Sequence, residues 1–168
     1  MKLHSQFEPG RTLLAWWKNL DENRAARAEL RRASDITEVT LSSHYQKLYR
    51  SLCAAGWDDA GRPNRRDALA AAVGLLAHVE LDDDKDLAHR MSETATDSDR
   101  VRVSELRFQR LLESPDIDSI FIGLRRVLPL MDKKANVIAL TNDVIYWGND
   151  VKKKWAYAYR WPATKDKF

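Results

Sequence analysis

The chain has 168 residues, 44% hydrophobic and 32% charged, with a formal net charge of +3. This length is enough to bury a hydrophobic interior without disulfides or metal ions, and it suits one domain or two small lobes. The sequence has no run of about 18 apolar residues, and its N-terminus lacks both a long apolar run and a small-residue cleavage site. We therefore expect no membrane span and no signal peptide, and we predict a cytoplasmic protein.

Charge is distributed unevenly along the chain. Residues 80–99 carry eight acidic and two basic residues, whereas residues 100–168 carry fourteen basic and eight acidic ones. An acidic segment thus separates two basic parts of the chain. A polyanionic partner would therefore bind the basic parts, and the small net charge understates their strength.

The first third of the chain has the pattern of helices. Apolar residues recur at helical spacing and do not alternate over any sustained run. Thr12 is predicted to cap the N-terminus of a helix over "LLAWWKNL". In "LSSHYQKLYRSL", the i, i+4, i+7, i+11 spacing predicts one buried face formed by Leu41, Tyr45, Leu48 and Leu52.

The next segment contains residues expected to end one helix and to begin the most buried one. Cys53 is predicted to be a small buried hydrophobe, and a single cysteine cannot form an internal disulfide, so nothing points to secretion. Gly56 is predicted to stop the preceding helix, and Pro63 to open the following one. The run "RRDALAAAVGLLAHVEL" is apolar on almost every side, which predicts the most buried helix of the fold.

Residues 92–100, "SETATDSDR", are polar and weakly patterned, which is typical of a flexible link. The predicted organisation is an N-terminal helical lobe of residues 1–91 and a C-terminal helical lobe of residues 92–168. The two lobes are expected to pack together, and a single continuous domain is the alternative. The predicted fold class is all-α, a helical bundle.

Arginine pairs recur on otherwise ordinary helices of the second lobe. In "VRVSELRFQRLLES", Ser104 is predicted to cap a helix that places Arg107 and Arg110 on one arc. In "IDSIFIGLRRVL", the apolar spacing requires at least one of Arg125 and Arg126 to face outward. Each pair alone is explained by a solvated face or local ion pairs, but four such features in one small chain favour a shared polyanion-binding surface.

The stretch "YWGNDVKKKWAYAYRW", residues 146–161, combines aromatic residues with three consecutive lysines. Wound as a helix, it places Trp155 and Tyr159 on the apolar side and Lys153 opposite them. The first two are therefore predicted to be core residues. Tyr157 and Trp161 remain candidates for contacts with nucleic-acid bases.

The sequence offers little evidence of catalytic chemistry. The four histidines match no metal-binding spacing, and neither a serine-hydrolase nor a P-loop signature occurs. A two-metal nuclease site at Asp82–Asp86 is the weaker interpretation, because acidic residues clustered in a polar loop are usually solvated. We therefore predict that the protein is not an enzyme and that it holds no metal and no cofactor.

The order of four blocks is distinctive: "AELRRA", "RVSELRFQRLL", "LRRVLPLM" and "NVIALTNDVIYWGNDVKKKWAYAY". Over residues 11–160 this series resembles CasB, the small subunit of the type I-E CRISPR surveillance complex Cascade. The resemblance implies an all-helical protein without enzymatic activity that sits as two copies in an RNA-guided complex. It also implies a basic face that contacts guide RNA and target DNA and helps hold the R-loop open.

The resemblance also implies which residues form that basic face. Carried over by position, the nucleic-acid-binding residues would be Arg31, Arg32, Arg100, Arg107, Arg110, Arg125, Arg126, Lys153 and Lys154. Asp150 precedes the lysine cluster and weakens its positive field. The acidic run Asp82–Asp86 matches no motif of the family and is interpreted as an insert that faces solvent or another protein.

The leading hypothesis is a non-catalytic subunit that binds guide RNA and target DNA through their backbones and stabilises the R-loop. Its partners would be the nucleic acids, other Cascade subunits and a second copy of the chain, with no membrane. The alternative is a structural adaptor whose charges make only protein–protein contacts.

Overall fold

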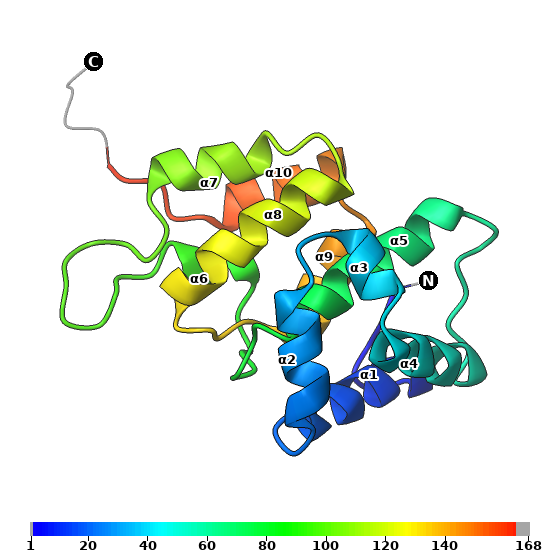
Figure 1. Ribbon diagram of the computed structural model, residues 1–168. Coiled ribbons are helices and arrows are strands. Elements are labelled where there is room, and N and C mark those ends of the chain that lie inside the picture. The colour runs from blue at the N-terminus through cyan, green and yellow to red at the C-terminus, as the bar shows by residue number, and fades with distance from the viewer. Residues whose placement is uncertain (1, 164–168) are drawn as a thin grey trace.

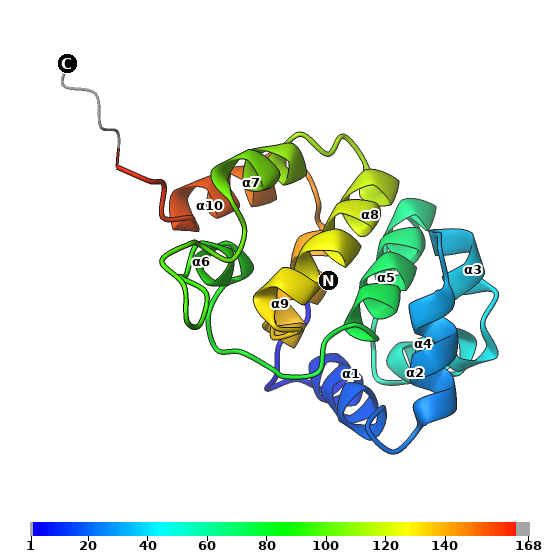
Figure 2. The same ribbon diagram turned by 60° about the vertical axis from the view of Figure 1, so that its left-hand side comes forward.

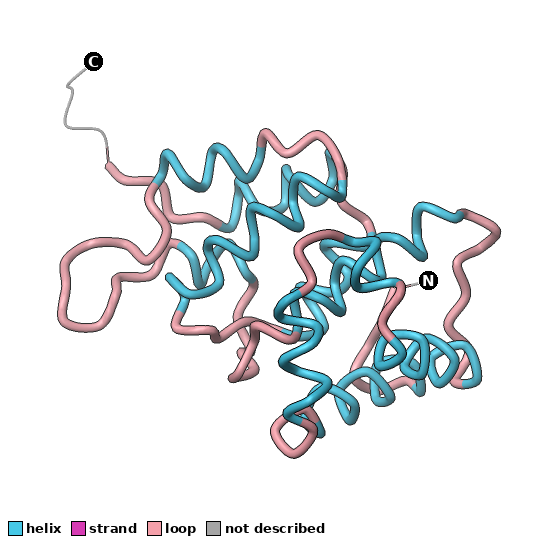
Figure 3. Tube along the Cα trace, viewed as in Figure 1, coloured by secondary structure: helices cyan, strands magenta, loops and turns pink. Residues whose placement is uncertain are grey.

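The computed structural model describes residues 2–163, which form ten α-helices and one short 3-10 helix (Figure 1). In chain order these are α1 (Glu8–Asn19), α2 (Arg24–Arg32), α3 (Ile36–Thr40), α4 (Ser43–Ala54), α5 (Pro63–Leu76), α6 (Leu87–Met91), α7 (Glu105–Leu112), α8 (Ile117–Val127), η1 (Leu128–Met131), α9 (Val137–Ile145) and α10 (Asn149–Ala158). No strand occurs within residues 2–163, so the predicted all-α class is confirmed (Figure 3). The same residues include no helix with the length and apolar character that crossing a membrane requires.

Short polar side chains begin most of the helices. An oxygen of the capping residue accepts a hydrogen bond from a backbone N–H of the first turn, which would otherwise lack a partner. The residues that cap in this way are Asn23, Asp35, Ser42, Ser104, Asp116 and Asn136. The predicted Ser104 cap is therefore confirmed. Pro63 is the first residue of α5, and Gly56, with φ +104°, follows the end of α4, as predicted.

The start of α1 differs from the prediction. The helix begins at Glu8 with Phe7 as its N-cap, so Thr12 lies inside the helix and caps nothing. Pro9 explains the earlier start, because proline fits the first turn of a helix. Backbone N–H groups there have no hydrogen-bond partner within the helix, so the N–H that proline lacks is not missed. The negative charge of Glu8 near the positive end of the helix dipole acts in the same direction.

Helix α5 is the centre of the fold, as its continuous apolar sequence predicted. All its residues from Ala68 to Leu76 are buried, and the helix packs against α3, α8 and α9. Figure 2 shows α5 between α8 and α3. Gly74 permits this packing, because a Cβ there would lie 2.7 Å from a methyl group of Val39 and 3.1 Å from the ring of Phe121.

Two predicted core residues are exposed instead. Leu41 is 78% exposed because it follows α3 and precedes the first turn of α4, so it does not share the helical face of Leu48 and Leu52. Cys53 is also exposed. It follows the buried Leu52 by one residue, and a rotation of about 100° around the helix turns its side chain toward solvent.

One hydrophobic core joins residues from both predicted lobes. Buried residues before and after position 92 belong to the same cluster, and α5 from the first range packs on α8 and α9 from the second. Residues 92–103 form a loop that returns on itself through an antiparallel bridge between Thr94 and Val101 (left in Figure 3). The division of the chain into two lobes at residue 92 therefore stays a prediction. The residues on both sides of it contribute to one core.

Candidate functional site

Three of the predicted arginines lie together along α7 and α8. Arg107 and Arg110 of α7 and Arg126 of α8 border a groove of about 450 Å³ between the two helices. All three side chains are exposed, and none has a hydrogen bond or ion pair with any other described residue. No acidic residue is among the described residues that line the groove. We call this feature the arginine groove.

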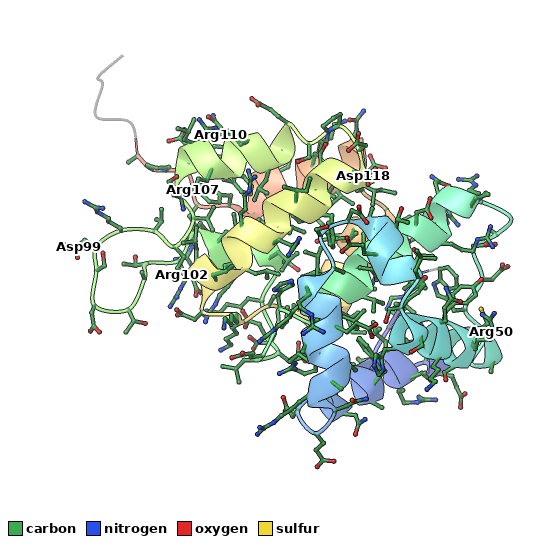
Figure 4. The ribbon with its side chains drawn as sticks, in the orientation of Figure 1. Arg50, Asp99, Arg102, Arg107, Arg110 and Asp118 are labelled. Atoms are coloured by element: carbon green, nitrogen blue, oxygen red, sulfur yellow. The ribbon has the colours of Figure 1, made fainter. Side chains whose placement is uncertain are left out.

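The groove exists because α7 and α8 approach each other closely. A Cβ at Gly123 of α8 would lie only 2.7 Å from a methyl group of Leu111 of α7, so glycine is the residue that allows this separation. Apolar side chains that include Ile122, Val127 and Leu130 line the groove with the arginines. Figure 4 shows Arg107 and Arg110 on α7, with Arg50 at the opposite end of the molecule.

Aromatic stacking holds α7 in place against α10. The ring of Phe108 stacks on Tyr159 at 4.0 Å between centroids and also on Trp155 at 6.4 Å. The Tyr159 hydroxyl donates to the backbone oxygen of Val103 at 2.7 Å, just before α7 begins. Trp155 and Tyr159 are 1% and 2% exposed, which confirms that both are core residues. The stacked rings of Phe108, Trp155 and Tyr159, which we call the aromatic layer, therefore fix the position of α7 and of the arginines on it.

Two other predicted arginines stabilise helix ends. Arg31 donates through Nε to the Ala77 oxygen at 2.7 Å and through a terminal nitrogen to Glu80 at 2.8 Å. Arg125 donates to the Arg31 oxygen at 3.3 Å and lies over the ring of Phe121. Both side chains satisfy carbonyl groups at the C-terminal ends of helices, where cations are favourable. We call Arg31, Arg125 and His78 the helix-end cluster.

The helix-end cluster keeps a net positive charge despite its ion pair with Glu80. Burial, together with the charges of Arg125, Arg31 and Lys133, lowers the pKa of His78 to about 4. The hydrogen bond from Arg31 holds the pKa of Glu80 below its ordinary value, with Lys133 3.6 Å away adding to the effect. The histidine is therefore neutral at physiological pH and contributes no charge of its own.

Arg32 and Arg100 are exposed, and neither side chain has a hydrogen bond or ion pair to another described residue. Arg32 follows Arg31 at the end of α2, beside the helix-end cluster. Arg100 lies in the loop of residues 92–103 that leads to α7. A contact from Arg125 to Arg31 joins α8 to α2, and the groove that Arg126 shares with Arg107 and Arg110 joins α8 to α7. We call these five arginines the basic tract.

The lysines of α10 are separated from this tract. Lys154 forms an ion pair with Asp143, whose second carboxylate oxygen accepts from Trp155 at 2.8 Å. Burial raises the pKa of Asp143, and the bonds from Lys154 and Trp155 oppose that rise. Lys154 also lines a different cavity that shares no residue with the arginine groove. Lys153 is exposed and, within residues 2–163, unpaired.

Sequence reasoning missed two residues that shape the basic tract. Lys133 contributes to the charge around His78 and pairs with Glu80. Arg102, with a side chain only 8% exposed, forms an ion pair with Asp132 that ties the loop before α7 to the end of η1. Neither lies on an amphipathic helix, so helical periodicity carried no signal for them. The doublet "KK" after "LPLM" was the only sequence hint for Lys133.

The acidic run at residues 82–86 has a structural role in the fold. Asp82 accepts a hydrogen bond from the Val137 N–H at 2.9 Å, at the start of α9. The Asp83 side chain is buried and lies 3.6 Å from Arg90. Within residues 2–163, no group of three or more His, Cys, Asp or Glu residues is placed to hold a metal ion.

Fold and site together define an all-α protein with a helix-borne cationic groove. The family described as CRISPR-associated protein Cse2 matches residues 26–159. The match covers most of the chain, which therefore belongs to the Cse2 family, the CasB small subunit of type I-E Cascade. The resemblance noted from the sequence is thus confirmed, and the chain is a subunit of a multi-subunit CRISPR complex. Comparisons with curated proteins and with solved structures gave no match.

Proposed function

We propose that this Cascade subunit is non-catalytic and binds the backbones of guide RNA and target DNA, thereby stabilising the R-loop. The observation that carries the proposal is the arginine groove, where Arg107, Arg110 and Arg126 are exposed, unpaired with other described residues and borne by two packed helices. We further propose that it acts in the cytoplasm, beside other Cascade subunits and a second copy of itself.

The chemistry of the groove suits phosphate recognition. A guanidinium group offers a planar fork of donors that matches two phosphate oxygens, and its charge persists at every physiological pH. Such contacts position a nucleic acid without reading its sequence. In an RNA-guided complex, base pairing with the guide supplies sequence information, and R-loop formation is nearly balanced in energy. A few backbone contacts are therefore enough to shift that balance.

The remaining predicted residues fall into two roles under this proposal. Arg32, Arg100 and Lys153 have donors free for phosphate oxygens. Arg31, Arg125 and Lys154 already donate to protein acceptors, so they contribute mainly to the local potential. Weak binding by the isolated subunit is sufficient, because assembly into Cascade raises the effective concentration of nucleic acid at the groove.

One observation favours the alternative of a protein-binding adaptor. The groove also has an apolar lining, and Ile122 on its surface is 46% exposed. Apolar surface beside arginines is typical of the centre of a protein–protein interface. The two functions therefore make different predictions for a variant that removes charge and keeps the apolar lining.

The test is a Cascade complex assembled with the Arg107→Ala, Arg126→Ala double variant. Both side chains are exposed, so folding and assembly should be unchanged. We expect target DNA to be retained about tenfold less well at roughly 0.1 M salt, because two charge-assisted contacts are lost. The matched control is Arg24→Ala, Arg50→Ala, which removes two exposed arginines from α2 and α4, away from the groove.

Retention equal to that of the parent complex would contradict the proposal. Failure of the double variant to enter the complex, with normal folding of the free subunit, would instead favour the adaptor. Loss of retention in the control as well would show that total charge, and not the groove, is responsible.

A further inference from the structure

The second half of α10 and the residues after it carry exposed aromatic and cationic side chains. We call Lys153, Tyr157, Arg160 and Trp161 the α10 patch. Tyr157 is 92% exposed, the highest value among the exposed large hydrophobic side chains of the described residues. Lys153 precedes it by four residues within α10, so the two side chains lie on the same side of the helix.

Trp161 is fixed in position although it is 40% exposed. Its indole N–H donates to the backbone oxygen of Ala156 at 2.7 Å. Its ring also meets Phe108 and Tyr159 edge-on, at 5.5 and 5.1 Å between centroids. An aromatic surface held in this way is ordered before any ligand arrives, so binding to it costs little side-chain entropy.

The cations of the α10 patch differ from their sequence neighbours. Lys152 lies over the ring of Trp147, and Lys154 pairs with Asp143. By contrast, Lys153 and Arg160 are exposed, and neither side chain has a hydrogen bond or ion pair to the rest of the described chain. The charges of the patch are therefore available to an external anion.

One member of the α10 patch, Trp161, borders α7, the helix that carries Arg107 and Arg110 of the arginine groove. Trp161 contacts Phe108 of α7, which follows Arg107 of the groove directly in sequence. Figure 2 shows α10 running beside α7. A helix with its side chains is about 10 Å across, so a flexible strand leaving the groove has to cross only α7 to reach Trp161.

We propose that the α10 patch binds unpaired bases of single-stranded nucleic acid. Tyr157 and Trp161 offer faces on which bases stack, while Lys153 and Arg160 bind the adjoining phosphates, a combination typical of single-strand binding. A protein partner fits less well, because Tyr157 is flanked by cations and lacks the apolar ring that excludes water around an interface hot spot. The inference rests on the proposed function and specifies that the strand bound here is single.

The experiment measures binding of the full-length chain to three labelled probes by fluorescence anisotropy at low salt. The probes are an oligothymidylate of about 15 nucleotides, an abasic strand of equal length and a duplex. Tyr157→Ala is expected to weaken binding to oligothymidylate by about 5- to 100-fold, with no change for the abasic strand or the duplex. Tyr157→Phe, which keeps the ring, should stay within about twofold of the parent.

Equal losses on the thymidylate and abasic probes would overturn the inference, because stacking requires a base. Unchanged binding of Tyr157→Ala to oligothymidylate would overturn it too. The Arg107→Ala, Arg126→Ala variant separates this failure from failure of the proposed function. That variant should lose affinity for all three probes alike. If it binds them as well as the parent does, the arginine groove is not the phosphate-binding site. The result for Tyr157→Ala still decides separately whether the α10 patch stacks bases.

Discussion

Arg125 and Arg126 are adjacent in the sequence but belong to two different regions. Arg125 faces the helix-end cluster, where it donates to the Arg31 backbone oxygen and lies over Phe121. Arg126 faces the arginine groove, where its donors have no partner among the described residues. A turn of about 100° around one helix therefore separates a structural arginine from one that is free to bind a ligand.

Under the proposed function, this difference assigns two tasks to the basic residues. The helix-end cluster holds the ends of α2, α5 and α8 together, and its charges spread a positive potential around His78. The arginine groove offers donors on helices whose positions that packing fixes. Sequence counts alone treat the two sets as equal, whereas contacts with a phosphate need donors that the protein leaves unoccupied.

The largest effect is expected from breaking the support of the groove. Trp155→Ala removes a ring that is 1% exposed, stacks on Phe108 of α7 and donates to Asp143. We expect the free energy of unfolding to fall by about 3–5 kcal/mol, as for other buried aromatic truncations. Chemical denaturation monitored by circular dichroism measures this change.

Tyr157→Ala, on the same helix, is the matched control for that measurement. Its side chain is 92% exposed, so the free energy of unfolding should change by less than about 0.5 kcal/mol. Equal stability of the Trp155 variant and the parent would show that the aromatic layer does not hold α7.

A smaller change in the free energy of unfolding tests the difference between the helix-end cluster and the arginine groove. Arg125→Ala leaves the Arg31 carbonyl without its donor and should lower the free energy of unfolding by about 1–3 kcal/mol. Arg126→Ala loses no intramolecular bond and should stay within about 0.5 kcal/mol of the parent. Denaturation of both variants under the same conditions gives the difference, and equal stabilities would show that the two regions are not distinct.

Much of the fold was predictable from local sequence. The Ser104 cap, the Gly56 stop and the Pro63 start follow from the geometry of helix ends. The burial of α5 follows from its continuous apolar composition. Two of the errors lie at helix boundaries: Leu41 falls between two helices, and the helix expected to start near Thr12 begins earlier, at Glu8. The third, Cys53, lies in α4 one residue from its buried face.

The site was predictable only in part, because pairing across the fold leaves little trace in sequence. Periodicity indicated that Arg107 and Arg110 share an arc, and both line the groove. It could not indicate that Arg31 would reach Ala77, or that Lys154 would meet Asp143. Gly123 is a further example. Glycine is required there because α7 packs closely against α8, and that contact is not evident from the sequence.

The most direct test of the central claim is the salt dependence of target DNA retention by the assembled complex. Each phosphate contact adds about 0.7–0.9 to the steepness of the log–log plot of affinity against salt. Compared with the parent, the Arg107→Ala, Arg126→Ala complex should therefore show a plot that is shallower by about 1.4–1.8, while the Arg24→Ala, Arg50→Ala control keeps the parent slope. Identical slopes for the double variant and the parent would contradict the claim that the arginine groove binds nucleic-acid phosphates.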